Sequence, residues 1–364
     1  MVKVAIVVPS LKQSGVLEVV RNILIKGKND PQLDFFLIVL KDVQNFGNKE
    51  KMQELLGDHL VILSGKRLLT IKKIQDFGRS IGNINPNIIH FNAFEADLFS
   101  RFVNKKDCKL ISTAHNMGKY DFIPTYGKLV GYTMGIVQKY LYKRMNLVIG
   151  VSKTVTNYYK KMNITDVSLV YNGTSISFDK TSKRNIGNLP RPIGIYSGNF
   201  EKRKNVEFLF DTYNKLPNAT LIVVGDDPRN KETLVKYRNR YKNIKFFGRV
   251  KNVSTYLKQA DYIISPSLSE GLPMAVIEGM ACNLPMILSN IPQHKELFLS
   301  KDEDIRFFDP TNENSLLNTI KKYIKGWPRN NNYVNEKIFE RNFSSEHMYL
   351  AYKKQYEKLI KEKF

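Results

Sequence analysis

The sequence predicts an α/β protein with two doubly wound parallel sheets, each in its own domain. Short apolar runs rich in Val, Ile and Phe recur along the 364 residues and alternate with helical patterns, which is typical of parallel strands joined by crossover helices. A chain of this length can form two hydrophobic cores of ordinary size. The alternation stops once, in a polar stretch with two prolines, and restarts at Pro192. We therefore expect residues 1–175 and 192–344 to form the two domains, with 176–191 as their linker.

The first half opens with a strand, a glycine loop and a helix. The apolar run 2–8 does not alternate, as expected of a strand buried on both faces, and Gly15 precedes a helix predicted from about Val16. The remaining strands of this half are expected at 35–40, 60–63, 88–91, 110–113, 147–151 and 167–170. Two of these strands end close to histidines, His90 and His115. Since most strand-end histidines serve the structure, the residues alone leave the function of both open.

The second half restarts with a strand at 192–197 and a basic loop. Gly198 allows a ligand to approach the backbone closely, and Lys204 lies beside the start of a helix predicted at Val206. A full positive charge next to the amides of a helix N-terminus suits a diphosphate, although a solvated basic loop is an equal alternative. Further strands are expected at 221–224 and 244–247, and they end at Gly225 and Gly248.

The chain is organised around a strand, a tight loop and a helix at 261–282. Glu270 lies in the loop, Pro273 marks the first turn of the helix, and Glu278 lies one to two turns inside it. The amides of such a helix end attract anions, and two carboxylates facing one crevice suit a polyhydroxy ligand that carries phosphate. A capped helix with two solvated acids is the alternative. A second strand and loop at 283–292 favour the binding site, because open α/β sheets bind ligands where such crossings meet.

The motif in this stretch resembles a known family. The pattern Glu270-Gly271-Leu272-Pro273, followed by Glu278-Gly279-Met280-Ala281, is similar to the donor-site signature of retaining glycosyltransferase family 4, the glycosyl transferases group 1. The resemblance implies the GT-B fold, in which two Rossmann-like domains face a central cleft. It makes 192–344 the nucleotide-sugar donor domain. It also implies that a C-terminal helix at 345–364 returns to complete the N-terminal, acceptor-side domain.

The resemblance implies roles for individual residues. The residues expected to act in catalysis are His115, Glu270 and Lys204. The residues expected to bind the donor are Gly15, Gly198, Asn199, Arg203, Lys204, Arg249, Val250, Gly271, Leu272, Pro273 and Glu278. Lys204, Arg203 and the loop amides would stabilise the leaving diphosphate. Glu278 would hold the ribose and Glu270 the sugar, while the backbone after Gly248 would hold the nucleobase.

The sequence departs from the family pattern at two loops. Asn199 stands where family members usually carry Arg after the glycine, and we expect Arg203 to substitute for it. The first loop has Gly15 alone where family members usually have two glycines.

The expected function is the transfer of a sugar from a nucleotide sugar, most simply a UDP-sugar, to a glycan or lipid-linked acceptor. By resemblance, transfer retains the anomeric configuration, the leaving phosphate takes the acceptor proton, and the product is a bacterial surface polysaccharide, exopolysaccharide, capsule or other cell-envelope glycan. The alternative is a nucleotide-sugar epimerase or hydrolase on the same fold, which needs acid and base groups on both sides of the sugar.

No cofactor beyond the donor substrate, and no metal ion, is expected. The run Asp302-Glu303-Asp304 has the spacing of a metal-binding Asp-x-Asp motif, but it lies in a polar loop after a helix, so we interpret it as solvated surface. Cys108 and Cys282 show no metal-ligand spacing and suggest buried thiols in a reducing compartment.

The charge balance predicts an acidic partner. The chain has 57 Lys and Arg against 34 Asp and Glu, a formal net charge of +23. No nucleic-acid-binding motif appears, so nucleic acid is not expected. Between 119 and 161, basic residues such as Lys128, Lys139, Lys143 and Arg144 interleave with apolar ones such as Leu129, Met134, Ile136 and Tyr142. This segment indicates either reversible contact with an anionic membrane or a helix packed on its sheet with solvated lysines.

No apolar run reaches the length of a membrane span. The expectation is a cytoplasmic enzyme that can touch the inner face of the cell membrane.

Overall fold

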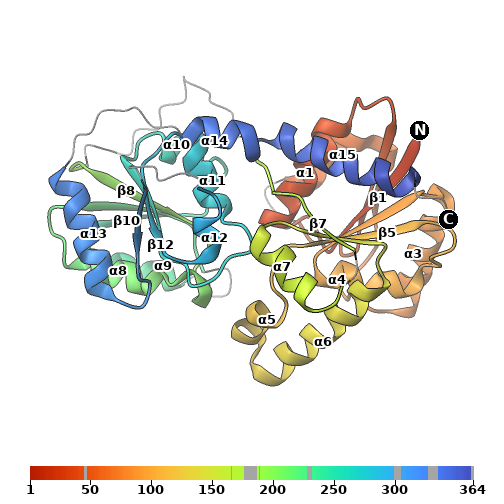
Figure 1. The fold of residues 1–364 in the computed structure, drawn as a ribbon, viewed down its shortest axis with the longest axis horizontal. Coiled ribbons are helices and arrows are strands. Elements are labelled where there is room, and N and C mark those ends of the chain that lie inside the picture. Colours follow the sequence, from red (N-terminus) through yellow and green to blue (C-terminus); the bar gives the residue numbers. More distant parts are fainter. Residues whose placement is uncertain are drawn as a thin grey trace. The chain divides into compact units, whose positions relative to one another are not determined.

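The computed structural model divides the chain into two compact units. Unit 1 comprises Met1–Ser175 with Asn342–Phe364, and unit 2 comprises Ile176–Arg341. The structure describes residues 1–44, 47–164, 166–175, 187, 189–227, 232–298, 305–326 and 335–361. Most of the predicted linker, 176–191, lies outside the described residues. Each unit has one parallel sheet with helices on both of its faces (Figure 1).

Unit 1 contains, among its described residues, a seven-stranded parallel sheet in the order β3-β2-β1-β4-β5-β6-β7. The strands are β1 (Val2–Val8), β2 (Leu33–Val39), β3 (Leu60–Ile62), β4 (Ile88–Asn92), β5 (Lys109–Ala114), β6 (Leu147–Gly150) and β7 (Val167–Leu169). Apolar residues on one face of this sheet, from β1, β2, β4, β5 and β6, form a core with α1 and α15. The strand order reverses between β1 and β4, and this is the position where doubly wound sheets bind ligands beyond the strand ends.

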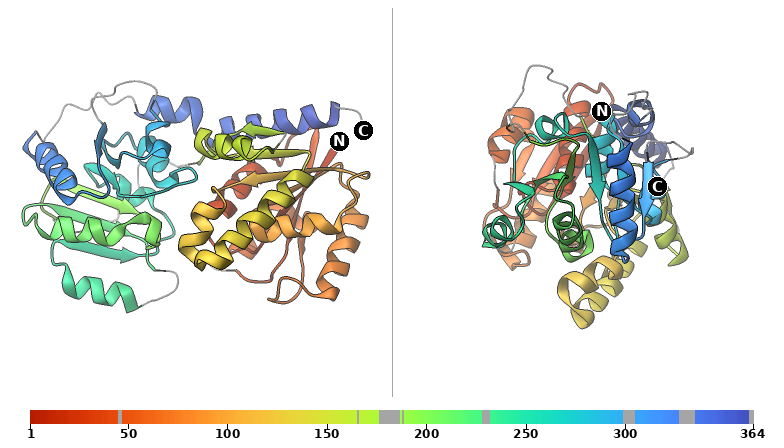
Figure 2. Two further views of the ribbon diagram at one scale, coloured as in Figure 1. Left: turned by 60° about the horizontal axis from the view of Figure 1, so that its bottom comes forward. Right: turned by 90° about the vertical axis from the view of Figure 1, so that its left-hand side faces the viewer.

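The helices of unit 1 follow the sequence pattern. They are α1 (Gly15–Gly27), α2 (Asn48–Leu56), η1 (Gly57–His59), α3 (Ile71–Ile84), α4 (Phe94–Asp97), η2 (Leu98–Phe102), α5 (Lys119–Tyr126), α6 (Lys128–Arg144), α7 (Lys153–Lys161) and α15 (Ser345–Lys361). Helix α1 begins where the Ser14 hydroxyl accepts a hydrogen bond from Leu17 N at 3.2 Å. Helices α5 and α6 form a hairpin that projects from the rest of unit 1 (Figures 1 and 2). Among the described residues, no helix is long and apolar enough to cross a membrane.

The C-terminal helix α15 belongs to the core of unit 1. Tyr352 and Tyr356 are fully buried, and the Tyr349 hydroxyl donates to Asp30 Oδ2 at 2.6 Å. His90 joins this helix to the sheet, because its Nδ1 lies 2.8 Å from Tyr356 Oη and its Nε2 lies 2.7 Å from Thr113 Oγ1. Burial lowers the pKa of His90 to about 3, so the ring is a neutral structural bridge. The structure thereby gives His90, whose function the residues alone left open, a structural role.

Unit 2 contains a six-stranded parallel sheet in the order β10-β9-β8-β11-β12-β13 within its described residues. The strands are β8 (Ile193–Ser197), β9 (Thr220–Val224), β10 (Ile244–Gly248), β11 (Tyr262–Ser265), β12 (Met286–Ser289) and β13 (Ile305–Phe308). The helices are η3 (Lys202–Lys204), α8 (Val206–Asn214), α9 (Glu232–Arg240), α10 (Ser254–Leu257), α11 (Met274–Ala281), α12 (Pro292–Lys295), α13 (Glu313–Lys325) and α14 (Asn335–Asn342). The order reverses between β8 and β11. The edge strand β13 was not predicted from the sequence.

Both sheets confirm the predicted α/β class with two doubly wound parallel domains.

Cys108 is buried and Cys282 is half-buried, and both are free thiols. Burial raises the pKa of Cys108 to about 11 and that of Cys282 to about 12. Neither thiol is therefore activated as a nucleophile.

Glycines close the ends of three adjacent strands in unit 2. Gly198 N donates to Val224 O at 2.9 Å, and Gly225 N donates to Gly248 O at 2.8 Å. Gly225 has a φ of 137°, and a Cβ on it would lie 1.9 Å from the carbonyl oxygen of Gly198. The backbones of the β8 and β9 ends can approach this closely only because Gly225 carries no side chain.

We predict that Gly225→Ala destabilises the protein. Backbone strain of this kind costs about 1–3 kcal/mol, and the clash with Gly198 adds to it, so the free energy of unfolding should fall by at least about 2 kcal/mol in a denaturant titration. Gly15→Ala is the control, because a Cβ there meets nothing within 4 Å. Equal stability of Gly225→Ala and the wild type would contradict the strand-end geometry.

Candidate functional site

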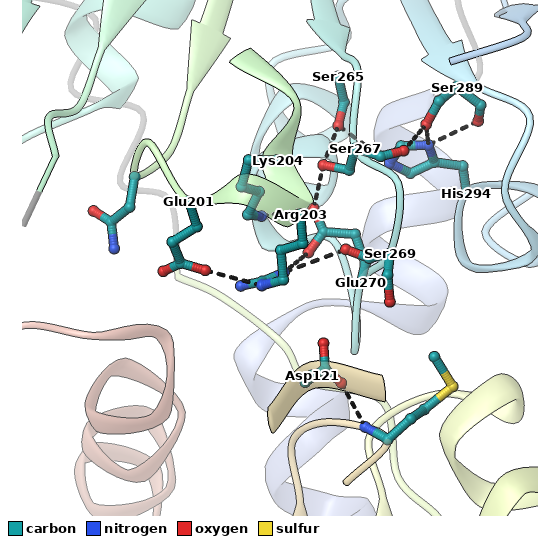
Figure 3. Close-up of polar contacts among 12 residues, drawn as sticks. Asp121, Glu201, Arg203, Lys204, Ser265, Ser267, Ser269, Glu270, Ser289 and His294 are labelled. Carbon is teal, nitrogen blue, oxygen red and sulfur yellow. Dashed lines mark hydrogen bonds and ion pairs between the residues drawn. The ribbon is translucent and has the colours of Figure 1, made fainter. Parts of the chain in front are cut away.

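The centre of the candidate site is the buried carboxylate of Glu270, in the loop between β11 and α11. Its Oε1 accepts hydrogen bonds from Lys204 Nζ at 2.6 Å and from the Ser267 hydroxyl at 2.7 Å. Its Oε2 accepts from Arg203 Nη1 at 2.9 Å. Figure 3 shows the two basic side chains converging on the carboxylate. The structure thus brings together three residues that the sequence analysis assigned to one site from separate motifs.

Electrostatics keep Glu270 ionised. Only 4% of its side chain is exposed, and burial by itself would raise its pKa. The positive charges of Lys204 and Arg203 outweigh that effect, together with the hydrogen bonds from Lys204 and Ser267, and lower the pKa from 4.5 to about 2. At neutral pH Glu270 is therefore a carboxylate and a weak base.

The loop that carries the two cations is fixed at several points. Arg203 Nε lies 2.9 Å from Glu201 Oε2, and Arg203 Nη1 also donates to Ser269 O at 3.3 Å. The backbone carbonyl of Arg203 accepts from Leu268 N at 2.8 Å, which ties this loop to the one before Glu270. The side chains of Arg203 and Lys204 keep 28% and 16% of their surface exposed. Both cations are thus held in place and still accessible.

The ends of β8, β9 and β10 form a second group of candidate residues. Gly198 closes β8, and the carbonyl of the exposed Asn199 accepts from the Tyr196 hydroxyl at 3.1 Å. Arg249 follows β10, and its guanidinium donates to Asp226 Oδ1 at 2.9 and 3.1 Å. Val250 follows Arg249 and is half-buried. Asp226 fixes the plane of Arg249, while binding of the donor by Arg249 stays a prediction.

Helix α11 begins directly after the Glu270 loop. Gly271, Leu272 and Pro273 are buried between Glu270 and the helix, and Pro273 is the N-cap residue. The first helical bond runs from Val276 N to Pro273 O at 3.0 Å, so the amides of residues 274 and 275 precede the hydrogen-bonded ladder. Glu278 lies on the second turn, half-buried. Its binding of a ribose stays a prediction.

One buried histidine near Glu270 was missed by the sequence analysis. His294 lies on α12, is fully buried, and contacts serines at the ends of β11 and β12. The sequence signal for it was the presence of Ser265, Ser267 and Ser289 at two strand ends followed by a histidine. Serines are common after strands, so this signal is weak without the structure.

Unit 1 contains a separate cavity of about 580 Å³. It lies beyond the ends of β1, β4 and β5, and its lining includes Ser14, Phe94, His115, Phe122, Met134 and Tyr142. His115 Nε2 lies 3.2 Å from Asn92 Oδ1, and burial lowers the pKa of His115 to about 4. At neutral pH this histidine can make polar contacts in the cavity as a neutral ring. Its expected catalytic role stays a prediction.

Gly15 lies apart from these contacts. Gly15 is the first residue of α1, where a Cβ would meet nothing within 4 Å, and its contact with a ligand stays a prediction. The Asp302-Glu303-Asp304 run lies outside the described residues. Among the residues that are described, no group of three His, Cys, Asp or Glu side chains could hold a metal ion. That catalysis needs no metal stays a prediction.

We predict that Glu270 makes a pH-dependent contribution to stability. Its folded-state pKa of about 2 lies below the unfolded value of 4.5, so the contribution is complete above pH 4.5 and is lost as the pH falls towards 2. In full it amounts to about 3 kcal/mol at 1.36 kcal/mol per pKa unit. The difference in unfolding free energy between the wild type and Glu270→Gln should therefore shrink on acidification. Glu340→Gln, an exposed carboxylate on α14, is the control, and a difference that is independent of pH would refute the assignment.

Comparison with known proteins gives a consistent result along the chain. Residues 178–338 match the family described as Glycosyl transferases group 1, and residues 43–178 match Glycosyltransferase Family 4. The O-antigen biosynthesis glycosyltransferase WclY of Escherichia coli is 26% identical over 99% of both chains. The capsular polysaccharide biosynthesis glycosyltransferase CapH of Staphylococcus aureus is 25% identical over 89% of this chain and 86% of its own.

Solved structures agree on the fold. Sucrose-phosphate synthase from Thermosynechococcus elongatus superimposes with a TM-score of 0.81 and 18% identity, covering 100% of both chains. The Anabaena protein HepE, solved in complex with UDP-glucose, gives a TM-score of 0.80 and 16% identity over 98% of this chain and 100% of its own. The chain therefore belongs to the family 4, group 1 glycosyltransferases and has their GT-B fold.

Proposed function

We propose that this glycosyltransferase moves a sugar from a UDP-sugar to a glycan or lipid-linked acceptor in the synthesis of a bacterial surface polysaccharide, with retention of the anomeric configuration. The observation that carries the proposal is the pairing of Lys204 and Arg203 with Glu270 at the reversal of strand order in unit 2. The relatives that act in O-antigen and capsule synthesis support the product class. The UDP-glucose bound to HepE supports the donor class.

The cations can bind and stabilise the leaving diphosphate. Lys204 and Arg203 are each partly exposed, and the first amides of α11 follow the same loop. Such groups act where negative charge develops as the bond to the sugar breaks. They are ordered before the donor arrives, so little reorganisation is needed in the reaction.

The protonation state of Glu270 bears on which group accepts the proton of the acceptor hydroxyl. A carboxylate with a pKa of about 2 that already accepts three hydrogen bonds is a poor general base. The proton of the acceptor hydroxyl therefore passes more readily to the leaving phosphate on the same face of the sugar. This supports the retaining mechanism. No relative named above is an epimerase or hydrolase, and none of the contacts described for the site favours that alternative.

Binding of the donor can be tested by thermal unfolding with a panel of UDP-, GDP-, ADP- and dTDP-sugars without added metal. A ligand at a hundred times its dissociation constant stabilises the protein by about 2.7 kcal/mol. We expect UDP-sugars to raise the unfolding temperature, and we expect Lys204→Ala and Glu278→Ala to abolish the rise.

Lys215→Ala is the matched control, because Lys215 is 56% exposed and pairs only with Glu313 among the described contacts. Lys204→Ala should also lower kcat about a hundredfold. No stabilisation by any nucleotide sugar, together with salt-sensitive binding of DNA or RNA, would refute the proposal.

The acceptor site that we propose is the cavity of unit 1. Its walls combine aromatic side chains such as Phe94 and Phe122 with the neutral ring of His115 and the Lys41–Glu95 ion pair. Aromatic faces suit sugar rings and apolar chains alike.

The outer face of α6 is the surface that we propose for reversible contact with an anionic membrane. Leu129 is 83% exposed, and Tyr132, Ile136 and Tyr140 on the same helical stripe are 55–56% exposed. No acidic residue occurs from 122 to 165, whereas Lys128 and Lys143 are exposed beside the stripe. Association with a second copy would bring two strongly basic surfaces together, so the charge favours an anionic bilayer.

Not every residue of the segment 119–161 belongs to this outer face. Met134 and Tyr142 line the cavity and do not face outward. Arg144 is also engaged, since its guanidinium donates to the carbonyls of Ser100 and Val103. The hairpin therefore has two faces, one that lines the cavity and one that is open and basic.

We predict that the protein co-sediments with vesicles that contain anionic lipid and not with zwitterionic vesicles. The combined change Lys128→Gln, Lys139→Gln and Lys143→Gln should weaken binding about a hundredfold, at roughly 1 kcal/mol per lysine. The double variant Leu129→Glu with Ile136→Glu should abolish it. Leu350→Glu, on an exposed position of α15, is the control, and binding that is insensitive to all the α6 variants would disprove this surface.

A further inference from the structure

His294 is held by a set of serines that come from two strand ends. Its Nδ1 lies 2.9 Å from Ser289 O and 3.0 Å from Ser289 Oγ. Its Nε2 lies 3.2 Å from Ser265 Oγ. All three residues are buried, and Figure 3 shows that the imidazole lies between the two serines, on the side of Ser267 that faces away from the cations.

The partners determine the tautomer of the imidazole. Burial lowers the pKa of His294 to about 4, so the ring is neutral and carries one proton. A carbonyl oxygen can only accept a hydrogen bond, and Ser289 O therefore places that proton on Nδ1. The unprotonated Nε2 then accepts the hydroxyl proton of Ser265.

The remaining hydroxyl protons connect His294 to Glu270. Ser289 Oγ donates to the carbonyl of Ser267 at 2.6 Å, and Ser267 Oγ donates to Glu270 Oε1 at 2.7 Å. Each hydroxyl uses its single proton once. The 3.4 Å separation between Ser265 Oγ and Ser267 Oγ is thus a contact without a hydrogen bond, because both protons are already engaged. One ordered path runs from His294 through Ser289 and Ser267 to the carboxylate.

The carboxylate of Glu270 is held from two loops, by the cations on one and by Ser267 on the other. Lys204 and Arg203 bind the carboxylate from the loop before α8, while Ser267 donates to it from the end of β11. Ser289 fixes the peptide of Ser267, and His294 fixes Ser289. Removing the histidine donor would leave Ser289 without the hydrogen bond that holds it, so Ser289 would fix the peptide of Ser267 less firmly and the Ser267 hydroxyl would orient the carboxylate less precisely.

We propose that His294 is a positioning residue that fixes the orientation of Glu270 for sugar transfer through Ser289 and Ser267. The inference rests on the proposed function of Glu270 in unit 2. It assigns no proton transfer to His294, since the ring serves as a fixed donor on one nitrogen and a fixed acceptor on the other. Groups that are held in this way set the geometry of the reacting centre.

Two substitutions of His294 separate its two nitrogens. In His294→Asn the amide nitrogen can replace Nδ1 and keep the bond to Ser289, whereas the bond to Ser265 is lost. In His294→Gln the longer amide can accept from Ser265, whereas the donor to Ser289 is lost. We expect kcat to fall by no more than about threefold in His294→Asn and about ten- to a hundredfold in His294→Gln, with the donor dissociation constant unchanged in both.

Two further variants support the kinetic test. Ser289→Ala interrupts the same path with a smaller change in volume, so it should reproduce the loss of kcat even if His294→Gln folds poorly. His347→Gln, at an exposed histidine of α15, is the control and should match the wild type. Equal losses in His294→Asn and His294→Gln, or full activity of Ser289→Ala, would overturn the proposal.

A spectroscopic measurement separates this inference from the proposed function. In the wild-type protein, ¹⁵N NMR of the histidine side chains should show His294 as a neutral ring protonated on Nδ1, and Ser289→Ala should shift that signal. An Nε2-protonated ring would overturn the inference whatever the enzyme does. If the wild type transfers no sugar from any nucleotide donor, the proposed function fails, whereas the tautomer still reports on the path.

Discussion

The buried carboxylate of Glu270 is the group on which the candidate site depends. A carboxylate with 4% of its surface exposed loses most of its hydration, and this cost is offset only by partners that are themselves held in place. Lys204 and Arg203 supply the charge, Glu201 balances Arg203, and Ser267 supplies a neutral donor. The four charges nearly cancel, so the cations are ordered without strong mutual repulsion. A diphosphate would meet two positioned donors next to the amides of α11, and it would not need to recruit them from solvent.

The parallel sheet explains why these residues can meet although they are far apart in the sequence. In a doubly wound sheet every strand ends at the same edge, so the loops after β8 and β11 are neighbours where the strand order reverses. Close packing of the glycine strand ends at Gly198 and Gly225 keeps this edge compact. The bond from Leu268 N to the carbonyl of Arg203 then ties the two loops together. The fold supplies proximity, and the local hydrogen bonds supply orientation.

The sequence was sufficient to predict the strands whose residues are buried on both faces, because these appear as apolar runs bounded by loops. Strand β13 was missed, since in Ile305–Phe308 only the two end residues are buried and Arg306 interrupts the run. The motif identified Glu270, and the basic loop identified Lys204 and Arg203. Their direct ion pairs could not be predicted, because 66 residues separate Lys204 from Glu270 and no spacing rule applies over such a distance. His294 was missed because its partners are serines, whose role depends on where each proton points.

Three histidines illustrate why burial alone does not identify a functional residue. Burial lowers the pKa of His90, His115 and His294 to between about 3 and about 4, so all three rings are neutral at physiological pH. His90 has both nitrogens engaged by Tyr356 and Thr113, and it can only join α15 to the sheet. His294 has both nitrogens engaged by serines that lead to a carboxylate, so it can influence chemistry without touching a substrate. His115 lines a cavity, and of the three it is therefore the ring that can offer a nitrogen to a ligand. What each nitrogen contacts, and not the shared shift in pKa, determines what each histidine can do.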